Sequence, residues 1–182
     1  MVEPPISLES FLGLVIRHFN AGLHERARLL CEQAAAAYPS QPAVLQLLAV
    51  ISLQEGEVAQ ASRHAEASLA LRPDHSPTQR VAADAWFRVA LLRQDLLDLG
   101  GAEQALRRVL ELNPERADAE TNLGIVLQER GRIDDAMRAY GRAYRLREDS
   151  FGRIAHALAA APMGRLWLDL GALQDELRNT PR

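Results

Sequence analysis

The sequence has no lysine and a single cysteine, and each shortage excludes a class of chemistry. Without lysine, the chain cannot form a Schiff base or a lysine-containing phosphate-binding loop. With Cys31 alone, it can form neither an intrachain disulfide nor a cysteine-rich metal site. The 24 acidic and 21 basic residues nearly balance, and a net charge of −3 gives no bulk attraction to nucleic acid or to an anionic membrane.

Aromatic residues and long apolar segments are also scarce. Aromatic residues make up 5% of the 182 residues. The apolar stretch at residues 11–16 is too short to span a bilayer, and no basic segment precedes it as in a signal peptide. We therefore expect a cytoplasmic protein that contacts neither membrane nor nucleic acid.

Alanine and leucine, in contrast, are abundant. The chain contains 30 alanines and 29 leucines, about one third of all residues, and both are strong helix formers. Residues that favour strands are few. This composition predicts an all-α protein, and together with an all-arginine basic set it is typical of a bacterial genome rich in G and C.

Two landmarks repeat along the chain with the same period. A small residue inside an apolar run recurs at spacings of 34, 41 and 34 residues, at Ala27, Ala61, Ala102 and Ala136. The positions where a helix is expected to end recur at the same spacings, at Pro39, Pro73, Pro114 and Glu148. A fixed period of this length indicates a stack of supersecondary units.

The pattern resembles the tetratricopeptide repeat, and residues 117–150, with Leu123-Gly124 and then Ala136, match that family best. Glu120 departs from it, because a large apolar residue is usual there. The resemblance implies a right-handed superhelical stack of antiparallel helix pairs, an α-solenoid. The predicted organisation is an N-terminal tail at 1–7, four repeats at 8–41, 42–75, 76–116 and 117–150, and C-terminal capping helices with a frayed tail at 151–182.

The third repeat contains seven extra residues, nearly two helical turns, which keep its apolar face in phase. Ser76 as N-cap and Pro77 after it predict one long helix from Pro77 to Leu99, ended by Gly100-Gly101. The alternative is a short loop over 76–82 before an ordinary helix.

The last segment fits the repeat poorly, as terminal repeats often do. Ser150 is expected to cap a helix that runs through Ala161, and Pro162 to break it. A second helix is then predicted from about Arg165, with leucines at helical spacing at Leu166, Leu170, Leu173 and Leu177.

No catalytic motif stands out in the sequence. It lacks a glycine-rich phosphate loop, an H-E-x-x-H pair and a nucleophile elbow, so we predict no catalytic residue, no metal, no cofactor and no enzymatic activity. Cys31 and His18 are interpreted as packing residues. The arginines at Arg142, Arg145, Arg147 and Arg153 are interpreted as a solvated face, with an acidic partner or a nucleic-acid patch as the alternative.

The resemblance implies that the first helix of each pair lines a concave groove that binds a partner protein. The groove residues so assigned are Leu12, Ile16, Phe19, Gln46, Val50, Leu53, Phe87, Arg88, Leu91, Gln94, Thr121, Asn122, Ile125 and Gln128. They are mostly apolar, with Asp84, Asp118 and Glu129 at the margin. Such a groove favours a peptide or an amphipathic helix with apolar anchors and basic flanks. Only Arg88 and Asn122 match the residue types of a carboxylate clamp, which argues against one.

Other molecules could cover the same apolar positions. A second copy of the chain would make a homodimer, and the C-terminal segment would fill the groove from within. Trp167 and Leu168 are a possible interface, or part of the cap on the fourth repeat. We therefore predict a non-catalytic scaffold or adaptor, with two alternatives: a secretion-type chaperone for a dedicated client, or the recognition module of a larger or associated enzyme.

Overall fold

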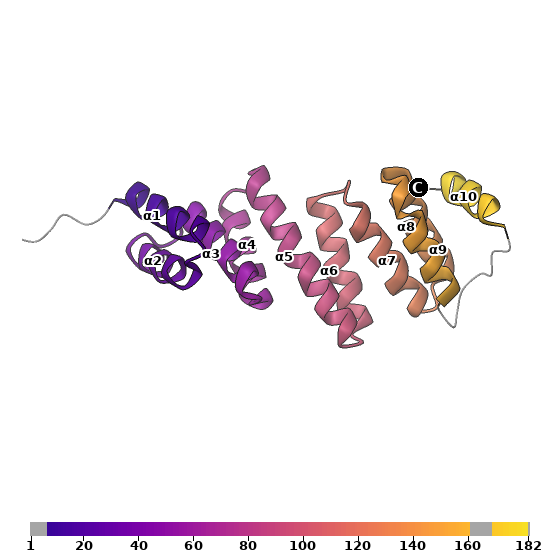
Figure 1. Ribbon diagram of the computed structural model, residues 1–182, viewed down its shortest axis with the longest axis horizontal. Coiled ribbons are helices and arrows are strands. Elements are labelled where there is room, and N and C mark those ends of the chain that lie inside the picture. Colours follow the sequence, from indigo (N-terminus) through magenta and orange to yellow (C-terminus); the bar gives the residue numbers. More distant parts are fainter. Residues whose placement is uncertain (1–6, 161–168, 182) are drawn as a thin grey trace, which may run out of the picture. The chain divides into compact units, whose positions relative to one another are not determined.

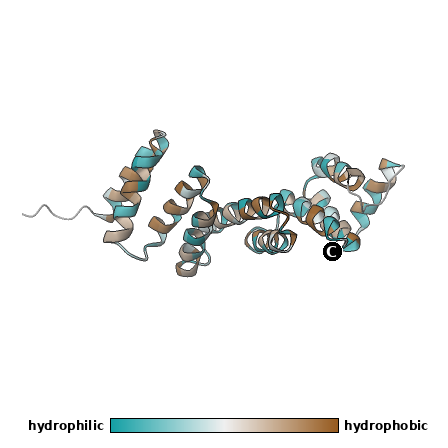
Figure 2. Ribbon diagram, turned by 90° about the horizontal axis from the view of Figure 1, so that it is seen from below, coloured by the Kyte–Doolittle hydropathy of each residue, from teal (hydrophilic) through white to brown (hydrophobic). Residues whose placement is uncertain are grey.

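The computed structural model describes residues 7–160 and 169–181, and within these ranges the only regular elements are helices. Neighbouring helices pack in pairs, which confirms the predicted all-α repeat fold (Figure 1). The chain divides into two compact units, an N-terminal unit Met1–Ala85 and a C-terminal unit Trp86–Arg182. Apolar and polar residues alternate along the helices (Figure 2), as expected for helices that bury one side.

The N-terminal unit contains two packed helix pairs and the start of a fifth helix. The pairs are formed by α1 (Leu8–Asn20), α2 (His24–Ala37), α3 (Pro42–Glu55) and α4 (Val58–Leu71). Ser7 starts α1 by accepting a hydrogen bond from the backbone N–H of Ser10 at 3.3 Å, and Gly56, at φ +80°, ends α3 in a left-handed cap. The core of α1–α3 is built from Phe11, Val15, Ala27, Cys31, Ala34, Val44, Leu48 and Ile51.

Cys31 is fully buried in that core, which confirms its interpretation as a packing residue. Its thiol lies 3.6 Å from the carbonyl oxygen of Val44. Burial raises the pKa of the thiol to about 12, so the reactive thiolate is absent at neutral pH.

The C-terminal unit contains the rest of the fifth helix and the remaining elements. They are α6 (Leu99–Leu112), α7 (Ala117–Glu129), α8 (Ile133–Leu146), a 3-10 turn η1 (Glu148–Ser150), α9 (Phe151–Ala160) and α10 (Leu170–Asn179). Helix α7 packs on α6, α8 and α9, and α10 packs on α8. The predicted helix after Ser150 is therefore α9, with Ser150 in the preceding 3-10 turn.

Small residues let α7 and α8 approach closely, as the repeat pattern predicts. An added Cβ on Gly124 would overlap the ring of Tyr140, 2.9 Å from Cζ and closer to the ring edge. That ring is fully buried, and its hydroxyl donates to Oε1 of Gln128 at 2.8 Å. Gly124 is therefore the position at which the two helices touch.

Helix α5 (Ser76–Asp95) has 20 residues, whereas α1–α4 have 13 or 14. The prediction that it ends at Gly100-Gly101 is wrong. The chain turns at Leu97, which has a left-handed backbone at φ +59°. Asp98 then starts α6 by accepting a hydrogen bond from the N–H of Gly101 at 2.9 Å. Both glycines therefore lie in the first turn of the next helix.

The start of the last helix is also corrected. Asp169 has an extended backbone, at φ −125° and ψ 112°, and its carboxylate accepts hydrogen bonds from the N–H groups of Gly171 and Ala172. Helix α10 therefore begins at Leu170 rather than near Arg165. The predicted break at Pro162 and the possible interface at Trp167 and Leu168 lie outside the described residues.

Candidate partner-binding site

A pocket of about 370 Å³ lies between α7 and α9 in the C-terminal unit. Its apolar lining comes from Ile125 of α7 and from Ala157 and Ala160 of α9. Charged and polar side chains complete the lining, namely Gln128, Glu129, Arg153 and His156. An apolar lining with a few convergent polar groups is typical of a binding pocket.

Hydrogen bonds hold the two walls of this pocket in place. The buried side chain of Gln128 donates from Nε2 to the carbonyl oxygen of Ala157 at 3.2 Å and accepts from the Tyr140 hydroxyl at 2.8 Å. Arg153 donates to Oδ1 of Asn122 at 3.4 Å, which joins α9 to α7 a second time. The pocket is therefore formed before any partner binds.

Two of the predicted groove residues, Ile125 and Gln128, line this pocket. Thr121, Asn122 and Gln128 are buried, and Thr121 donates to the carbonyl oxygen of Ala117 at 2.9 Å within its own helix. A buried side chain that is already hydrogen-bonded offers little to a partner. Of the predicted residues on α7, Ile125 thus has the most surface to offer.

The other predicted groove residues of the C-terminal unit lie on α5. Arg88 and Leu91 are exposed, whereas Phe87 and Gln94 are half-buried. The guanidinium of Arg116 lies over the Phe87 ring, 4.3 Å from its centroid. The exposed part of this set is therefore Arg88 and Leu91.

The predicted groove residues of the N-terminal unit lie on α1 and α3. Ile16 is exposed, and the remaining five residues of this set are half-buried. Leu12 and Phe19 pack against the core of the unit, and Oε1 of Gln46 accepts a hydrogen bond from the Thr78 hydroxyl at 3.0 Å. Val50 and Leu53 are half-buried on α3.

Sequence reasoning missed the α9 wall of the pocket. It assigned Arg153 to a solvated face and all of 151–182 to a cap. The repeat period contained a signal, because His156 lies 34 residues after Asn122, a predicted groove position. Continuing the register by one more repeat would have placed α9 on the same surface as α7.

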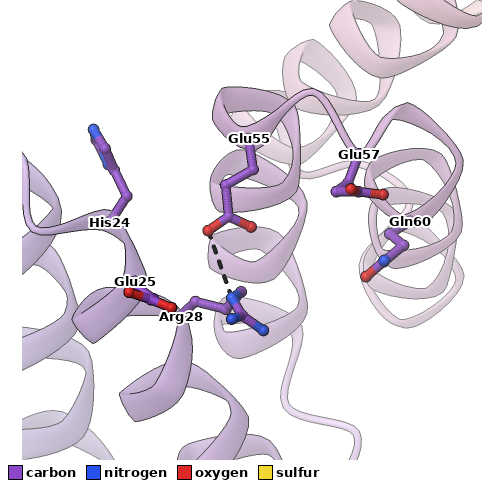
Figure 3. Close-up of a pocket in the computed structure, with 6 residues that line it drawn as sticks. All are labelled: His24, Glu25, Arg28, Glu55, Glu57 and Gln60. Atoms are coloured by element: carbon purple, nitrogen blue, oxygen red, sulfur yellow. Dashed lines mark ion pairs between the residues drawn. The ribbon is translucent and has the colours of Figure 1, made fainter.

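A second, polar pocket of about 530 Å³ lies in the N-terminal unit, where α2 faces the ends of α3 and α4 (Figure 3). Its lining residues are His24, Glu25, Arg28, Glu55, Glu57 and Gln60. Arg28 forms an ion pair with Glu55 at 3.5 Å, while His24 points away from that pair (Figure 3). The lining is acidic, and no apolar side chain is present to anchor a partner.

No group of three or more histidine, cysteine or acidic side chains in the described part of the chain is placed to hold a metal ion. The helices described there include none with the length and hydropathy needed to cross a bilayer.

Comparison with known proteins identifies the repeat. A family model described as tetratricopeptide repeat matches residues 83–116. The curated protein "Tetratricopeptide repeat protein 8" of Caenorhabditis elegans is 34% identical over 70 residues, which is 38% of this chain and only 14% of that relative's length.

Solved structures of MamA extend the likeness to nearly the whole chain. One matches with a TM-score of 0.65 at 18% identity, covering 93% of this chain and 85% of that one. A second matches with a TM-score of 0.58 at 25% identity, covering 92% and 96%. The first of these likenesses, at this low identity, concerns the fold alone.

Proposed function

Since the chain is a member of the tetratricopeptide repeat family, we propose that it is a non-catalytic scaffold that binds a segment of a partner protein in the α7–α9 pocket. The observation that carries the proposal is the composition of this pocket, which combines an apolar lining with charged side chains. Proteins with this kind of repeat generally bind other proteins, and the finer assignment to one pocket is ours.

The lining indicates the chemistry of the partner segment. Ile125, Ala157 and Ala160 offer a surface for one or more apolar side chains. Glu129 offers a carboxylate to a basic side chain, and Arg153 and His156 offer hydrogen bonds to an acidic group. A segment with an apolar anchor between a basic and an acidic residue would satisfy all of these groups, as in helix-in-groove recognition.

Within the N-terminal unit, Ile16 is the exposed member of the predicted groove set. Leu12 and Phe19 contribute mainly to the core there, so their replacement would destabilise the fold as well as binding. We therefore assign the specificity of binding to the α7–α9 pocket.

Site-specific photocrosslinking tests this proposal. A photoreactive amino acid at His156 should form a covalent adduct with a partner in extract of the source cells. The control position is Gln104, an exposed residue of α6 that does not line the pocket. Adducts at His156 that are absent at Gln104 support the proposal, whereas equal labelling at both positions, or none at either, contradicts it.

A substitution that fills the pocket provides the second test. Ala160→Arg places a long side chain at an exposed position that lines the pocket. Its matched control is Ala159→Arg, exposed on the same turn of α9 but absent from the lining. The proposal requires the adduct at His156 to disappear with Ala160→Arg and to remain with Ala159→Arg.

A further inference from the structure

Three exposed leucines lie at the C-terminal end of α5 and in the turn that follows it. Leu91, Leu92 and Leu96 are 37%, 50% and 71% exposed. Adjacent apolar side chains with this much exposure mark a surface that another molecule covers, because isolated exposed leucines are common but groups are not.

Two opposite charges flank the leucines along the helix. Arg88 lies about one helical turn before Leu91 and Leu92, and Asp95 lies about one turn after them. Both charged side chains are exposed. Neither forms an ion pair with another residue in the described part of the chain. At 3.6 residues per turn, Arg88, Leu91, Leu92 and Asp95 lie within roughly 100° of arc on one side of the helix.

This surface is complementary to itself when the direction of the helix is reversed. We propose that α5 pairs with α5 of a second copy of this chain, antiparallel, about a two-fold axis between Leu91 and Leu92. Arg88 of one copy then lies level with Asp95 of the second copy, and the reverse pair forms on the other side of the axis. Leu91 and Leu92 of the two copies meet between the two ion pairs.

The charges select this arrangement over the alternatives. A parallel pairing in register would set Arg88 beside Arg88 and Asp95 beside Asp95, which is repulsive. An isologous antiparallel interface uses the same patch on both copies, and this is the symmetry of most homodimers. A second copy of the chain necessarily carries the charges that match Arg88 and Asp95, whereas an unrelated partner protein would need the same charges at the same spacing.

The inference goes beyond the scaffold proposed above, because it uses α5 and leaves the α7–α9 pocket free in both copies. A dimer of this kind would present two pockets to a partner. The pocket-filling variant Ala160→Arg is therefore expected to leave the dimer intact. Failure of one proposal consequently does not imply failure of the other.

Charge reversal followed by mixing tests the pairing, with the mass measured by sedimentation velocity over a range of concentrations. The native chain should be a dimer. Arg88→Asp gives a copy with two acids at the flanking positions, and Asp95→Arg gives a copy with two bases. Each variant alone should dimerise at least about tenfold more weakly, because both ion pairs become like-charge contacts.

The mixture of the two variants is the decisive sample. An Arg88→Asp copy paired with an Asp95→Arg copy restores both ion pairs, so the equimolar mixture should form heterodimers with the native affinity. The controls are Arg26→Asp and Asp74→Arg, which reverse exposed charges of the N-terminal unit and should change nothing. Circular dichroism checks that every variant is folded.

The remaining outcomes overturn the inference. A native chain that stays monomeric at the highest concentration contradicts it. So does a dimer whose mass is unaffected by either reversal, since the interface would then lie elsewhere. Single variants that dissociate without recovering on mixing would contradict the antiparallel register.

Discussion

Gly124→Ala tests the packing of α7 on α8, on which the α7–α9 pocket depends. The added methyl group would overlap the Tyr140 ring, which is fully buried and held by its hydrogen bond to Gln128. Overpacking of this kind costs about 1–3 kcal/mol. Against this, alanine in a helix interior is more stable than glycine by roughly 0.5–1 kcal/mol. Because the ring cannot move without breaking its hydrogen bond, we expect a net loss of about 1–2 kcal/mol.

Thermal unfolding followed by circular dichroism measures this loss. For a chain of this size, each 1 kcal/mol lowers the melting temperature by about 2–4 °C, so we expect a decrease of roughly 2–8 °C. The matched control is Gly13→Ala in α1, where an added Cβ meets nothing within 4 Å. That control should melt slightly higher than the native chain. A Gly124→Ala variant as stable as Gly13→Ala would refute the proposed contact.

Three further substitutions or treatments probe individual features. Leu97→Gly should raise the free energy of unfolding, measured by chemical denaturation, by about 1 kcal/mol. The left-handed backbone is strained for leucine, and the side chain, which is 81% exposed, contributes little packing. A loss of stability would contradict this expectation. Cys31 should react with a thiol reagent at pH 8 only after unfolding. Rapid labelling of the folded chain by the reagent would contradict the burial of this thiol. Because folding raises the pKa of the thiol from 9.0 to about 12, its burial in the neutral form contributes stability that is complete below pH 9 and is lost as the pH rises toward 12. Glu103→Gln should lower the free energy of unfolding at pH 7 by roughly 1–3 kcal/mol, because it removes acceptors for Arg107 and Arg132. Burial opposes ionisation of Glu103, but hydrogen bonds from these arginines outweigh it and lower the pKa, so its contribution is present above pH 4.5 and lost as the pH falls below that value. The native chain should therefore lose more stability on acidification than the variant, and parallel pH profiles would argue against it.

The helix pairing could be predicted from the sequence because it depends on local spacing. The recurrence of Ala27, Ala61, Ala102 and Ala136 fixes which residues face the neighbouring helix, and all four are buried. The missing side chain at Gly124 likewise leaves space on α7 for a large side chain from α8, and the ring of Tyr140 occupies it.

Helix ends were harder to predict, because they depend on side-chain hydrogen bonds rather than on periodicity. Gly100-Gly101 is a common stop signal, but the carboxylate of Asp98 caps a new helix at that point and the turn is made by Leu97. In the same way, the carboxylate of Asp169 caps the last helix, so α10 begins at Leu170.

The candidate site was predicted only in part, for a different reason. Helical spacing indicates the direction in which a residue on α7 points, but it does not indicate which later helix lies there. Gln128 was assigned to an open groove, whereas it hydrogen-bonds to α8 and to the backbone of α9. Likewise, Glu120 stands at a usually apolar position because Arg142 of α8 pairs with it at 2.7 Å.

The most direct test of the account is the affinity of the partner segment identified by crosslinking at His156. Its binding to the native chain should be measured by titration calorimetry beside Ala160→Arg and Ala159→Arg. The account predicts that Ala160→Arg weakens binding by at least about tenfold, or 1.4 kcal/mol, while Ala159→Arg matches the native chain. Equal affinities for all three proteins would contradict the assignment of partner binding to the α7–α9 pocket.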